Sequence, residues 1–452
     1  MTGGEWTGAA VAAAVAAYAL GSRRLAGTPV STAMVFAAFG LLIGPAGLGL
    51  PLPGPDSGLL LPLLETALAL VLFTDSMAIR RRTLRRGRFL PGRLLGIGLP
   101  LTIGAGWLLA WPLFPELGVW ELALVGVVLA PTDAALGRTT VSSPRVPALV
   151  RQGLTVESGL NDGMVLPFFV LFLAAAPATA GAEAGVAQVF WRALVLSSAL
   201  GMVIGWTGGR LLKWSGARGW VTPEWGQALP LALAAGSYFL ADSTGGSGFI
   251  AVWMAGFAFG AALRSATGPE GSGDAAALAE DLGGLLAALS FLVFGAVLLG
   301  PTLERLEWRT VCYALLSLTV VRMVPVALSL LGSGLRAPTV AFVGWFGPRG
   351  LASVILGLLA VRDGGPGLER LGSVMAVTVF LSIVLHGVSA AALSERLGRW
   401  YGEASAGAGA PLREEMDTGP AGDEWLGARH RWLGPFARQE RGGQERGGPP
   451  AR

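Results

Sequence analysis

Residues 127–137 read VVLAPTDAALG, and residues 155–162 read TVESGLND. In the first stretch, Pro131 cannot donate a backbone hydrogen bond and it disfavours helix at Ala130, so an apolar span should break there, beside Asp133. Inside a membrane, a broken helix is tolerated only where the freed backbone lines protein or water, and in transporters such breaks lie at the substrate site. The first stretch therefore predicts a broken transmembrane helix with an acid next to the break.

The second stretch places acids and an amide where lipid would otherwise lie. Ser158 and Asp162 are four residues apart, as are Glu157 and Asn161, so the two pairs occupy neighbouring stripes of one helix face. A carboxylate in the middle of a span costs about 2.5–3.5 kcal/mol, which makes such residues functional candidates by default. A structural polar network that only holds helices together is the alternative.

A second interruption is predicted in residues 341–357, AFVGWFGPRGLASVILG, where Pro348 and two glycines surround Arg349. The two interrupted spans occupy matching places in the two halves of the chain, which indicates an inverted repeat of spans four to six and eleven to thirteen. If the breaks cross, Asp133 lies near positive helix N-termini and Arg349 near negative C-termini. A simple salt bridge is the alternative role for Arg349.

Arg322, in LTVVRMVPV at residues 318–326, is a second cation inside a span. A buried carboxylate such as Glu157 is its expected partner, because a buried charge needs an opposite charge. The sequence does not choose between Arg322 and Arg349 for that pairing.

Three further polar residues lie in apolar surroundings. Glu65 is in the middle of the third span and is a candidate for the cation pathway. Asp75 is near the end of that span and is expected to pair with the arginines that follow it. His386 is expected to be a packed histidine with satisfied hydrogen bonds.

Composition excludes several classes of protein. Of 452 residues, 53% are apolar and only 14% charged, with a mean hydropathy of +0.60, so a soluble globular domain is excluded. The single cysteine, Cys312, rules out an intrachain disulfide, and the two histidines are too far apart in sequence for a zinc motif. The net charge of +4 comes from arginines in loops and tail rather than on one face, which argues against nucleic-acid binding.

The apolar stretches predict an all-α polytopic membrane protein with about thirteen spans of about 20 residues each. The approximate limits are 6–21, 30–46, 59–79, 94–113, 119–141, 147–176, 188–211, 226–242, 247–263, 283–300, 310–331, 338–361 and 371–396. The first span is expected to be retained rather than cleaved as a signal peptide, since no basic segment precedes it. Glycine makes up 68 of the 452 residues, and much of it lies inside the spans, where small residues let helices approach closely.

The loop charges predict the orientation, because basic residues in short loops stay on the cytoplasmic side. Basic loops follow the first, third, fifth, seventh and eleventh spans: Arg23 and Arg24; Arg80 to Arg88; Arg138 and Arg145; Arg210, Lys213 and Arg218; and Arg336. The loops at 304–309 and 362–370 are mixed and carry little weight. The N-terminus is therefore expected outside and the C-terminus in the cytoplasm. After Tyr401 the composition predicts a disordered tail.

With these motifs in place, the sequence resembles the bacterial sodium/proton antiporters of the NhaP type, in the monovalent cation:proton antiporter-1 family. The resemblance covers nearly all of the membrane region. It rests on LFTDSMAIRRRTLRR (72–86), LAPTDAALG (129–137), PRVPALVRQGLTVESGLNDG (144–163), GSGFIAVWMAGFAFG (246–260), FGPRGLASVILG (346–357) and FLSIVLHGVSA (380–390). The VESGLND run that follows APTDAALG is the most specific of these.

The resemblance implies about thirteen helices, a homodimer, and a six-helix core that moves against a dimerisation domain by elevator-type alternating access. The implied organisation is helices 1–3 of the dimerisation domain at 1–92, core helices 4–6 at 93–180, a linking helix 7 at 181–224, dimerisation-domain helices 8–10 at 225–308, core helices 11–13 at 309–400, and the cytoplasmic tail at 401–452. Two broken crossing helices are part of this antiporter fold.

The resemblance also implies roles for individual residues. Asp162 corresponds to the carrier of cation and proton, and Asn161 before it to the amide that in relatives accompanies electroneutral exchange. Ser158 and the Thr132 backbone carbonyl are similar to cation ligands, and Glu65 to an acid just outside those ligands. The residues that correspond to the network holding the two breaks are Asp133, Asn161, Arg349, Arg322 and Glu157, the last being the family's ion-bridged glutamate.

We therefore expect exchange of Na+, and also Li+, for H+ across the cell membrane. One carboxylate cannot hold a proton and a cation well at the same time, so the two compete for Asp162. No cofactor and no enzymatic activity are expected. A K+/H+ antiporter of the same mechanism is the main alternative, because oxygen ligands alone do not set ion size. An intramembrane hydrolase with Ser158 as nucleophile lacks a nearby base in sequence, and a non-transporting sensor has no special support.

Overall fold

The computed structural model describes residues 3–25, 28–50, 58, 60–79, 89–133, 136, 143, 145–176, 185–264, 275–363 and 368–406. Within these residues every regular element is helical. The helices, with short π-helical stretches labelled η, are α1 (Gly3–Leu25), α2 (Thr32–Ile43), α3 (Leu60–Met77), α5 (Phe89–Arg93), η1 (Leu94–Gly98), α6 (Leu99–Leu113), α7 (Val119–Val128), α9 (Ala148–Ala175), α11 (Val186–Trp191), η2 (Arg192–Leu196), α12 (Ser197–Gly216), α13 (Pro223–Ser243), α14 (Gly248–Arg264), α16 (Ala277–Val293), η3 (Phe294–Leu299), α17 (Gly300–Glu304), α18 (Trp308–Leu318), α19 (Val320–Ser329), α20 (Ala337–Trp345), α21 (Leu351–Asp363) and α22 (Glu369–Ala406).

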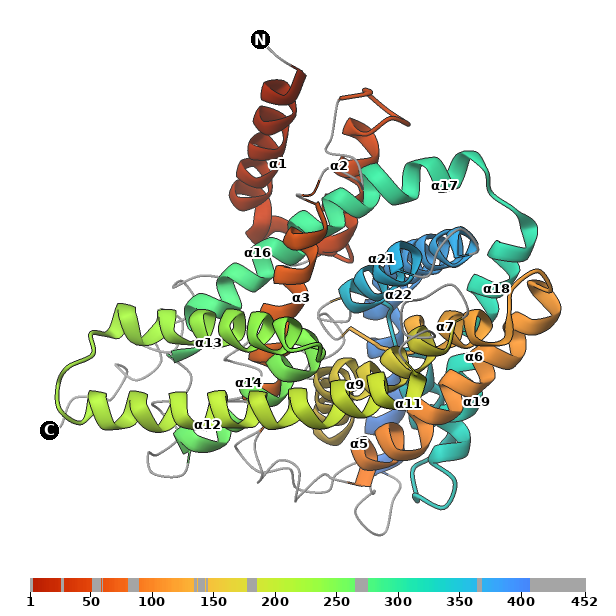
Figure 1. The fold of residues 1–452 in the computed structure, drawn as a ribbon. Coiled ribbons are helices and arrows are strands. Elements are labelled where there is room, and N and C mark those ends of the chain that lie inside the picture. The colour runs from red at the N-terminus through yellow and green to blue at the C-terminus, as the bar shows by residue number, and fades with distance from the viewer. Residues whose placement is uncertain are drawn as a thin grey trace, which may run out of the picture.

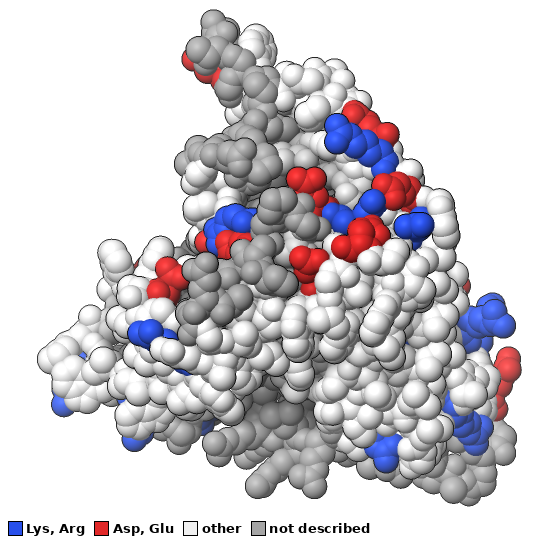
Figure 2. Space-filling view, turned by 45° about the vertical axis from the view of Figure 1, so that its right-hand side comes forward, with Lys and Arg blue, Asp and Glu red and all other residues white. Residues whose placement is uncertain are grey.

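These helices occupy each of the thirteen predicted spans, and the predicted all-α fold is confirmed. By length and composition, seven helical stretches are long and apolar enough to cross a membrane: Leu60–Met77, Phe89–Leu113, Ala148–Ala175, Val186–Gly216, Ala277–Glu304, Trp308–Ser329 and Glu369–Ala406. Shorter apolar helices accompany them: α2, α7 and α14. Figure 2 shows a broad uncharged area on one face, with acidic and basic side chains gathered mainly in a band above it. The chain is a multi-pass membrane protein.

Both predicted breaks are present. Helix α7 ends at Val128, and residues 130–133 leave the helix at Pro131. The span predicted at 338–361 consists of α20 and α21, separated by the non-helical residues 346–350. Most of the remainder of the predicted fifth span, up to residue 141, lies outside the described residues.

Two boundaries differ from the sequence prediction. The eleventh span is also interrupted, at Thr319 between α18 and α19, where the Thr319 hydroxyl donates to the Leu315 carbonyl at 2.7 Å. The same bond is present at Thr102 and Thr207 inside continuous helices, so this hydroxyl does not by itself account for the interruption. Helix α22 continues past Tyr401, where the tail was expected to begin, and ends at Ala406. Residues 407–452, the rest of the predicted tail, lie outside the described residues.

Contacts divide most of the helices into two groups (Figure 1). The first, the α14 group, consists of α2, α3, α12, α13, α14 and α16; the second, the α9 group, consists of α6, α7, α9 and α18 to α22. In Figure 1 the long helices α12 and α13 lie side by side on the left, and α6, α7, α19 and α22 gather on the right.

Glycines bring the helices of the α14 group into close contact. A Cβ atom at Gly201 or Gly205 of α12 would lie 2.1 Å or 2.0 Å from the carbonyl oxygens of Ala251 and Ala255 on α14. On its other side, α14 meets α3 at Gly256, where a Cβ atom would lie 2.2 Å from the Phe73 carbonyl oxygen. Small residues thus let these backbones touch, as expected for helices that pack within lipid.

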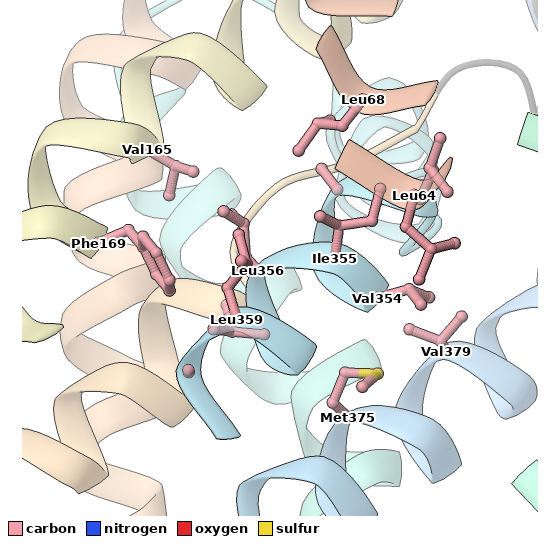
Figure 3. Close-up of a cluster of buried hydrophobic side chains, with 14 of the residues drawn as sticks. Leu64, Leu68, Val165, Phe169, Val354, Ile355, Leu356, Leu359, Met375 and Val379 are labelled. Atoms are coloured by element: carbon pink, nitrogen blue, oxygen red, sulfur yellow. The ribbon is translucent and has the colours of Figure 1, made fainter. Parts of the chain in front are cut away.

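An apolar layer joins the two groups (Figure 3). Leu64 and Leu68 of α3 are buried and face α21, where Ile355 is fully buried between the groups. On the other side of α21, Leu359 lies toward Phe169 of α9. The layer contains no hydrogen bond between these side chains, so apolar contact alone joins the groups here.

Candidate cation site

The two breaks meet through their backbones. The Asp133 N–H donates a hydrogen bond of 2.7 Å to the Pro348 carbonyl. A Cβ atom at Gly350 would lie 2.2 Å from the Asp133 carboxylate oxygen Oδ2, so this glycine makes room for the acid. The carboxylate therefore lies at the N-terminal end of α21, where unpaired N–H groups attract negative charge.

Arg349 lies at the C-terminal end of the other interrupted helix, α7. Its guanidinium Nη1 donates to the carbonyl oxygens of Ala130 at 2.7 Å and Pro131 at 3.2 Å, just beyond the end of α7. The Arg349 side chain is fully buried. It therefore neutralises carbonyls that lost their helical partners, as the crossing of the breaks predicted.

Glu157 pairs with Arg322 and not with Arg349. Two guanidinium nitrogens of Arg322 donate to the two carboxylate oxygens of Glu157, at 3.0 Å and 3.1 Å. Both side chains are 2% exposed, and such a bidentate pair within a low-dielectric interior holds its geometry strongly. A Cβ atom at Gly347 would lie 2.5 Å from the Arg322 Nε, so the second break also makes room for this arginine. The question that the sequence left open is thereby answered.

Thr132 links the first break to the acidic face of α9. Its hydroxyl donates to Glu157 Oε2 at 3.2 Å and accepts from the Asn161 amide at 2.6 Å. Its backbone carbonyl accepts a hydrogen bond of 2.8 Å from the Ser158 hydroxyl. The carbonyl and hydroxyl oxygens predicted as cation ligands therefore touch each other.

Asp162 lies one helical turn after Ser158 on α9 and is half-buried. Asn161, beside it, is fully buried, and its amide also reaches Glu157 Oε1 at 3.4 Å. The structure thus brings Thr132, Ser158, Asn161 and Glu157 together around the break, with Asp162 on the more open side of the same helix.

Glu65 lies elsewhere. Its carboxylate is 3.6 Å from an Arg362 guanidinium nitrogen at the end of α21, and Tyr238 of α13 lies nearby. Among the described residues, no hydrogen bond or ion pair of Glu65 reaches Thr132 or Ser158. The cation-site role that the family resemblance implied for Glu65 stays a prediction.

Two residues of α22, Ser382 and His386, brace the second break; the sequence had indicated only His386, as a packed histidine, and gave no sign of Ser382. Ser382 accepts the Arg349 backbone N–H at 2.7 Å, and the His386 Nε2 lies 2.9 Å from the Trp345 carbonyl at the end of α20. Its Nδ1 lies 2.9 Å from the Ser382 carbonyl. The Ser382 hydroxyl, 3.2 Å away, can donate to Nδ1, so a neutral ring that donates from Nε2 to the Trp345 carbonyl has a partner at each nitrogen. The four-residue spacing of Ser382 and His386 was the sequence signal for a shared face.

Comparisons with known proteins agree with an antiporter-like arrangement of broken helices. The family model described as sodium/hydrogen exchanger, transmembrane, matches residues 10–396. The chain belongs to this family. The structure superimposes with a TM-score of 0.74 on the sodium proton antiporter MjNhaP1 from Methanocaldococcus jannaschii, at 20% identity, and covers 88% of this chain and 98% of that one. That similarity shows the shared fold.

Curated relatives carry names for more than one cation. The chain is 24% identical over 375 residues to the K(+)/H(+) antiporter NhaP of Alkalimonas amylolytica, and 26% identical over 417 residues to the Na(+)/H(+) antiporter 2 of Zygosaccharomyces rouxii. These matches cover 79% and 82% of this chain but only 60% and 50% of the relatives. The chain therefore spans between half and three fifths of the length of these relatives.

Proposed function

We propose that this protein exchanges a monovalent cation for a proton across the cell membrane, with both competing for Asp162. The observation that carries the proposal is the contact of the Ser158 hydroxyl with the Thr132 carbonyl at a helix break, one turn before a half-buried carboxylate. Carboxylate, carbonyl and hydroxyl oxygens together form a ligand set suited to a small hard cation.

The place where the two helix breaks meet, at residues 130–133 and 346–350, is called the crossing. Its charges support exchange of one cation for one proton. Asp133, Glu157 and Asp162 supply three carboxylates, and the guanidinium groups of Arg322 and Arg349 supply two positive charges. With all five ionised, the site carries one net negative charge, which either one monovalent cation or one proton neutralises. Moving a charged site through a low-dielectric barrier is costly, so only the occupied or protonated site should cross. This supports electroneutral exchange.

The division of the helices supports elevator-type movement. The α9 group holds all residues of the crossing, whereas the α14 group contacts it through an apolar layer. In this proposal the α9 group, from the ranges 93–180 and 309–400, is the moving core. Helix α12 belongs to the linking helix at 181–224, and the other helices of the α14 group, with α1, belong to the dimerisation domain of a homodimer. Movement across an apolar layer breaks few polar contacts, which keeps its cost low.

The loop charges support an outside N-terminus and a cytoplasmic C-terminus. The loops at 304–309 and 362–370, whose mixed charge said little about orientation, contain arginines with acidic partners. Arg370 lies 3.2 Å from a Glu116 carboxylate oxygen and also pairs with Glu307. Arg362 likewise pairs with Glu65. These arginines lie on the proposed outer side, where neighbouring acids offset their charge.

Sodium is the cation we propose first, with lithium as a second substrate. The K(+)/H(+) names of two relatives, from Alkalimonas amylolytica and Shewanella oneidensis, make potassium the specific alternative. In both cases the same oxygen ligands and the same carboxylate carry the exchange.

The test is proton flux in proteoliposomes that hold a preformed pH gradient, with sodium, lithium and potassium added in turn. Sodium or lithium should dissipate the gradient, and Asp162→Asn should abolish this, because an amide neither releases a proton nor pairs with a cation. The control is Asp281→Asn, an exposed aspartate on α16, which should exchange normally. Clamping the voltage with valinomycin and potassium in the sodium assay should leave the sodium-driven rate unchanged.

Each other outcome has a definite meaning. A response to potassium alone would move the proposal to K+/H+ exchange. Normal exchange by Asp162→Asn would overturn the assignment of the carrier. If no cation changes the gradient at any pH, the protein is not an antiporter and the sensor hypothesis gains.

A further inference from the structure

The two helix groups touch at one contact beside Asp162. Gly163 of α9 lies directly against the indole ring of Trp253 on α14. A Cβ atom at Gly163 would lie 2.2 Å from both Cε2 and Nε1 of that ring. Real Cβ atoms do not approach other atoms this closely, so only glycine fits while the ring keeps this position.

The ring is held firmly from the side of the α14 group. Its helix is fixed by the close glycine contacts with α12 and α3, which flank Trp253 at Ala251, Ala255 and Gly256. The ring also stacks on Phe257, one turn further along, with centroids 6.5 Å apart and an angle of 15° between the planes. Trp253 therefore presents a flat surface to α9 that cannot easily retreat.

The polar end of this ring has no partner. The Trp253 Nε1 is buried and makes no hydrogen bond within the part of the chain that the structure describes. A buried N–H without a partner costs free energy and calls for an explanation. An interface that must slide provides one, because a hydrogen bond across it would have to be broken in every cycle.

We propose that Trp253 is a positioning residue of the transport cycle. Its ring is the contact surface on α14 against which α9 packs at Gly163, the residue that follows Asp162. The inference rests on the proposed exchange function. The Trp253 ring fills the space that a side chain at position 163 would occupy, so this contact forms only in one relative position of α9 and α14. The contact between Gly163 and Trp253 thereby fixes the position of Asp162 relative to the α14 group in this conformation.

The test is the variant Gly163→Ala, measured for exchange and for cation binding. Exchange should fall at least about tenfold, equal to about 1.4 kcal/mol in barrier height, because the added methyl group prevents docking. Stabilisation of the protein against heat by the transported cation should persist, since no ligand of the site has changed. Gly104→Ala on α6 is the matched control, because a Cβ atom there meets nothing within 4 Å.

A second variant tests the contact directly. Trp253→Leu removes the ring atoms that the methyl group would strike, so Gly163→Ala should no longer slow exchange in that background. This reversal is the coupling that a double-mutant cycle detects between touching residues. The comparison within the Trp253→Leu background also decides the question if Gly163→Ala alone fails to fold.

Three results would overturn the inference. The first is exchange at the wild-type rate by Gly163→Ala, and the second is the same loss from Gly163→Ala with leucine at position 253 as with tryptophan. The third is loss of cation stabilisation together with exchange, which would mean that the site itself is deformed. A wild-type protein that neither binds nor exchanges any of the three cations would instead overturn the proposed function, and this inference with it.

Discussion

The α14 group and the crossing in the α9 group both bring helix backbones close together, but by opposite chemistry. At Gly205 a helix touches the carbonyl oxygen of Ala255 with no polar side chain involved. At the crossing, Arg349 donates to the Ala130 and Pro131 carbonyls, and Arg322 pairs with Glu157. The difference lies in the backbone: the helices of the α14 group satisfy their own hydrogen bonds, whereas the two breaks release groups that need charged partners.

This contrast fits the proposed roles, in which the α14 group is a rigid frame and the crossing binds the ions. Close apolar contact costs nothing in unpaired polar groups, so the α14 group makes a stable frame. The crossing holds buried charges, and in the proposed exchange they balance when one cation or one proton is bound. Three variants test the contrast, from the largest expected loss of stability to the smallest.

Breaking the buried ion pair should have the largest effect. Arg322→Met leaves the Glu157 carboxylate buried without its charged partner, and such a loss typically costs about 3–5 kcal/mol. The measurement is thermal unfolding of the purified protein in detergent. The double variant Glu157→Leu with Arg322→Met should be more stable than Arg322→Met alone, because no uncompensated charge remains. A double variant that is less stable than both single variants would show that the pair is not the main source of the loss.

Filling a glycine contact in the α14 group should have an intermediate effect. In Gly205→Ala the new Cβ atom would lie 2.0 Å from the Ala255 carbonyl oxygen, which belongs to a backbone that cannot rotate away. Overpacking of this kind costs about 1–3 kcal/mol. Gly236→Ala on α13 serves as the control, since nothing lies within 4 Å of its Cβ position. Equal unfolding temperatures for Gly205→Ala and the wild type would refute close packing as the basis of the frame.

Removing an exposed ion pair should have the smallest effect. Arg145, just before α9, pairs with Glu395 of α22, and their side chains are 61% and 54% exposed. Water screens such a pair, so Glu395→Gln should change the free energy of unfolding by at most about 1 kcal/mol. The unfolding temperature should differ little between low and high salt. A loss as large as that of Arg322→Met would contradict the distinction between buried and exposed charges.

The sequence predicted both breaks from local chemistry. Pro131 and Pro348 each lack a backbone donor, and the glycines around Arg349 lower helix stability further. It also predicted the polar face of α9, because helical spacing alone places Glu157 and Asn161 together. The third interruption, at Thr319, was missed, because a threonine is no signal of a break: Thr102 and Thr207 lie inside continuous helices.

Pairings between distant helices could not be predicted. Arg322 and Arg349 are both arginines inside apolar spans, and only their positions in the structure show that Glu157 pairs with Arg322. The sequence likewise offered no sign that Glu65 faces Arg362 and Tyr238. Nor did it show that Gly163 receives the Trp253 ring, because the two residues are far apart along the chain.

The sequence by itself determined that the chain is an all-α membrane protein, where its helices break, and which residues carry charge into the membrane. These features follow from apolar length, missing backbone donors and helical period, all of which act over a few residues. Only the tertiary structure decided which charge meets which, and that the Ser158 hydroxyl and the Glu157 carboxylate both meet Thr132 at the first break. Those choices depend on how helices distant in the sequence cross, because each buried charge is stable only beside the partner that the fold brings to it.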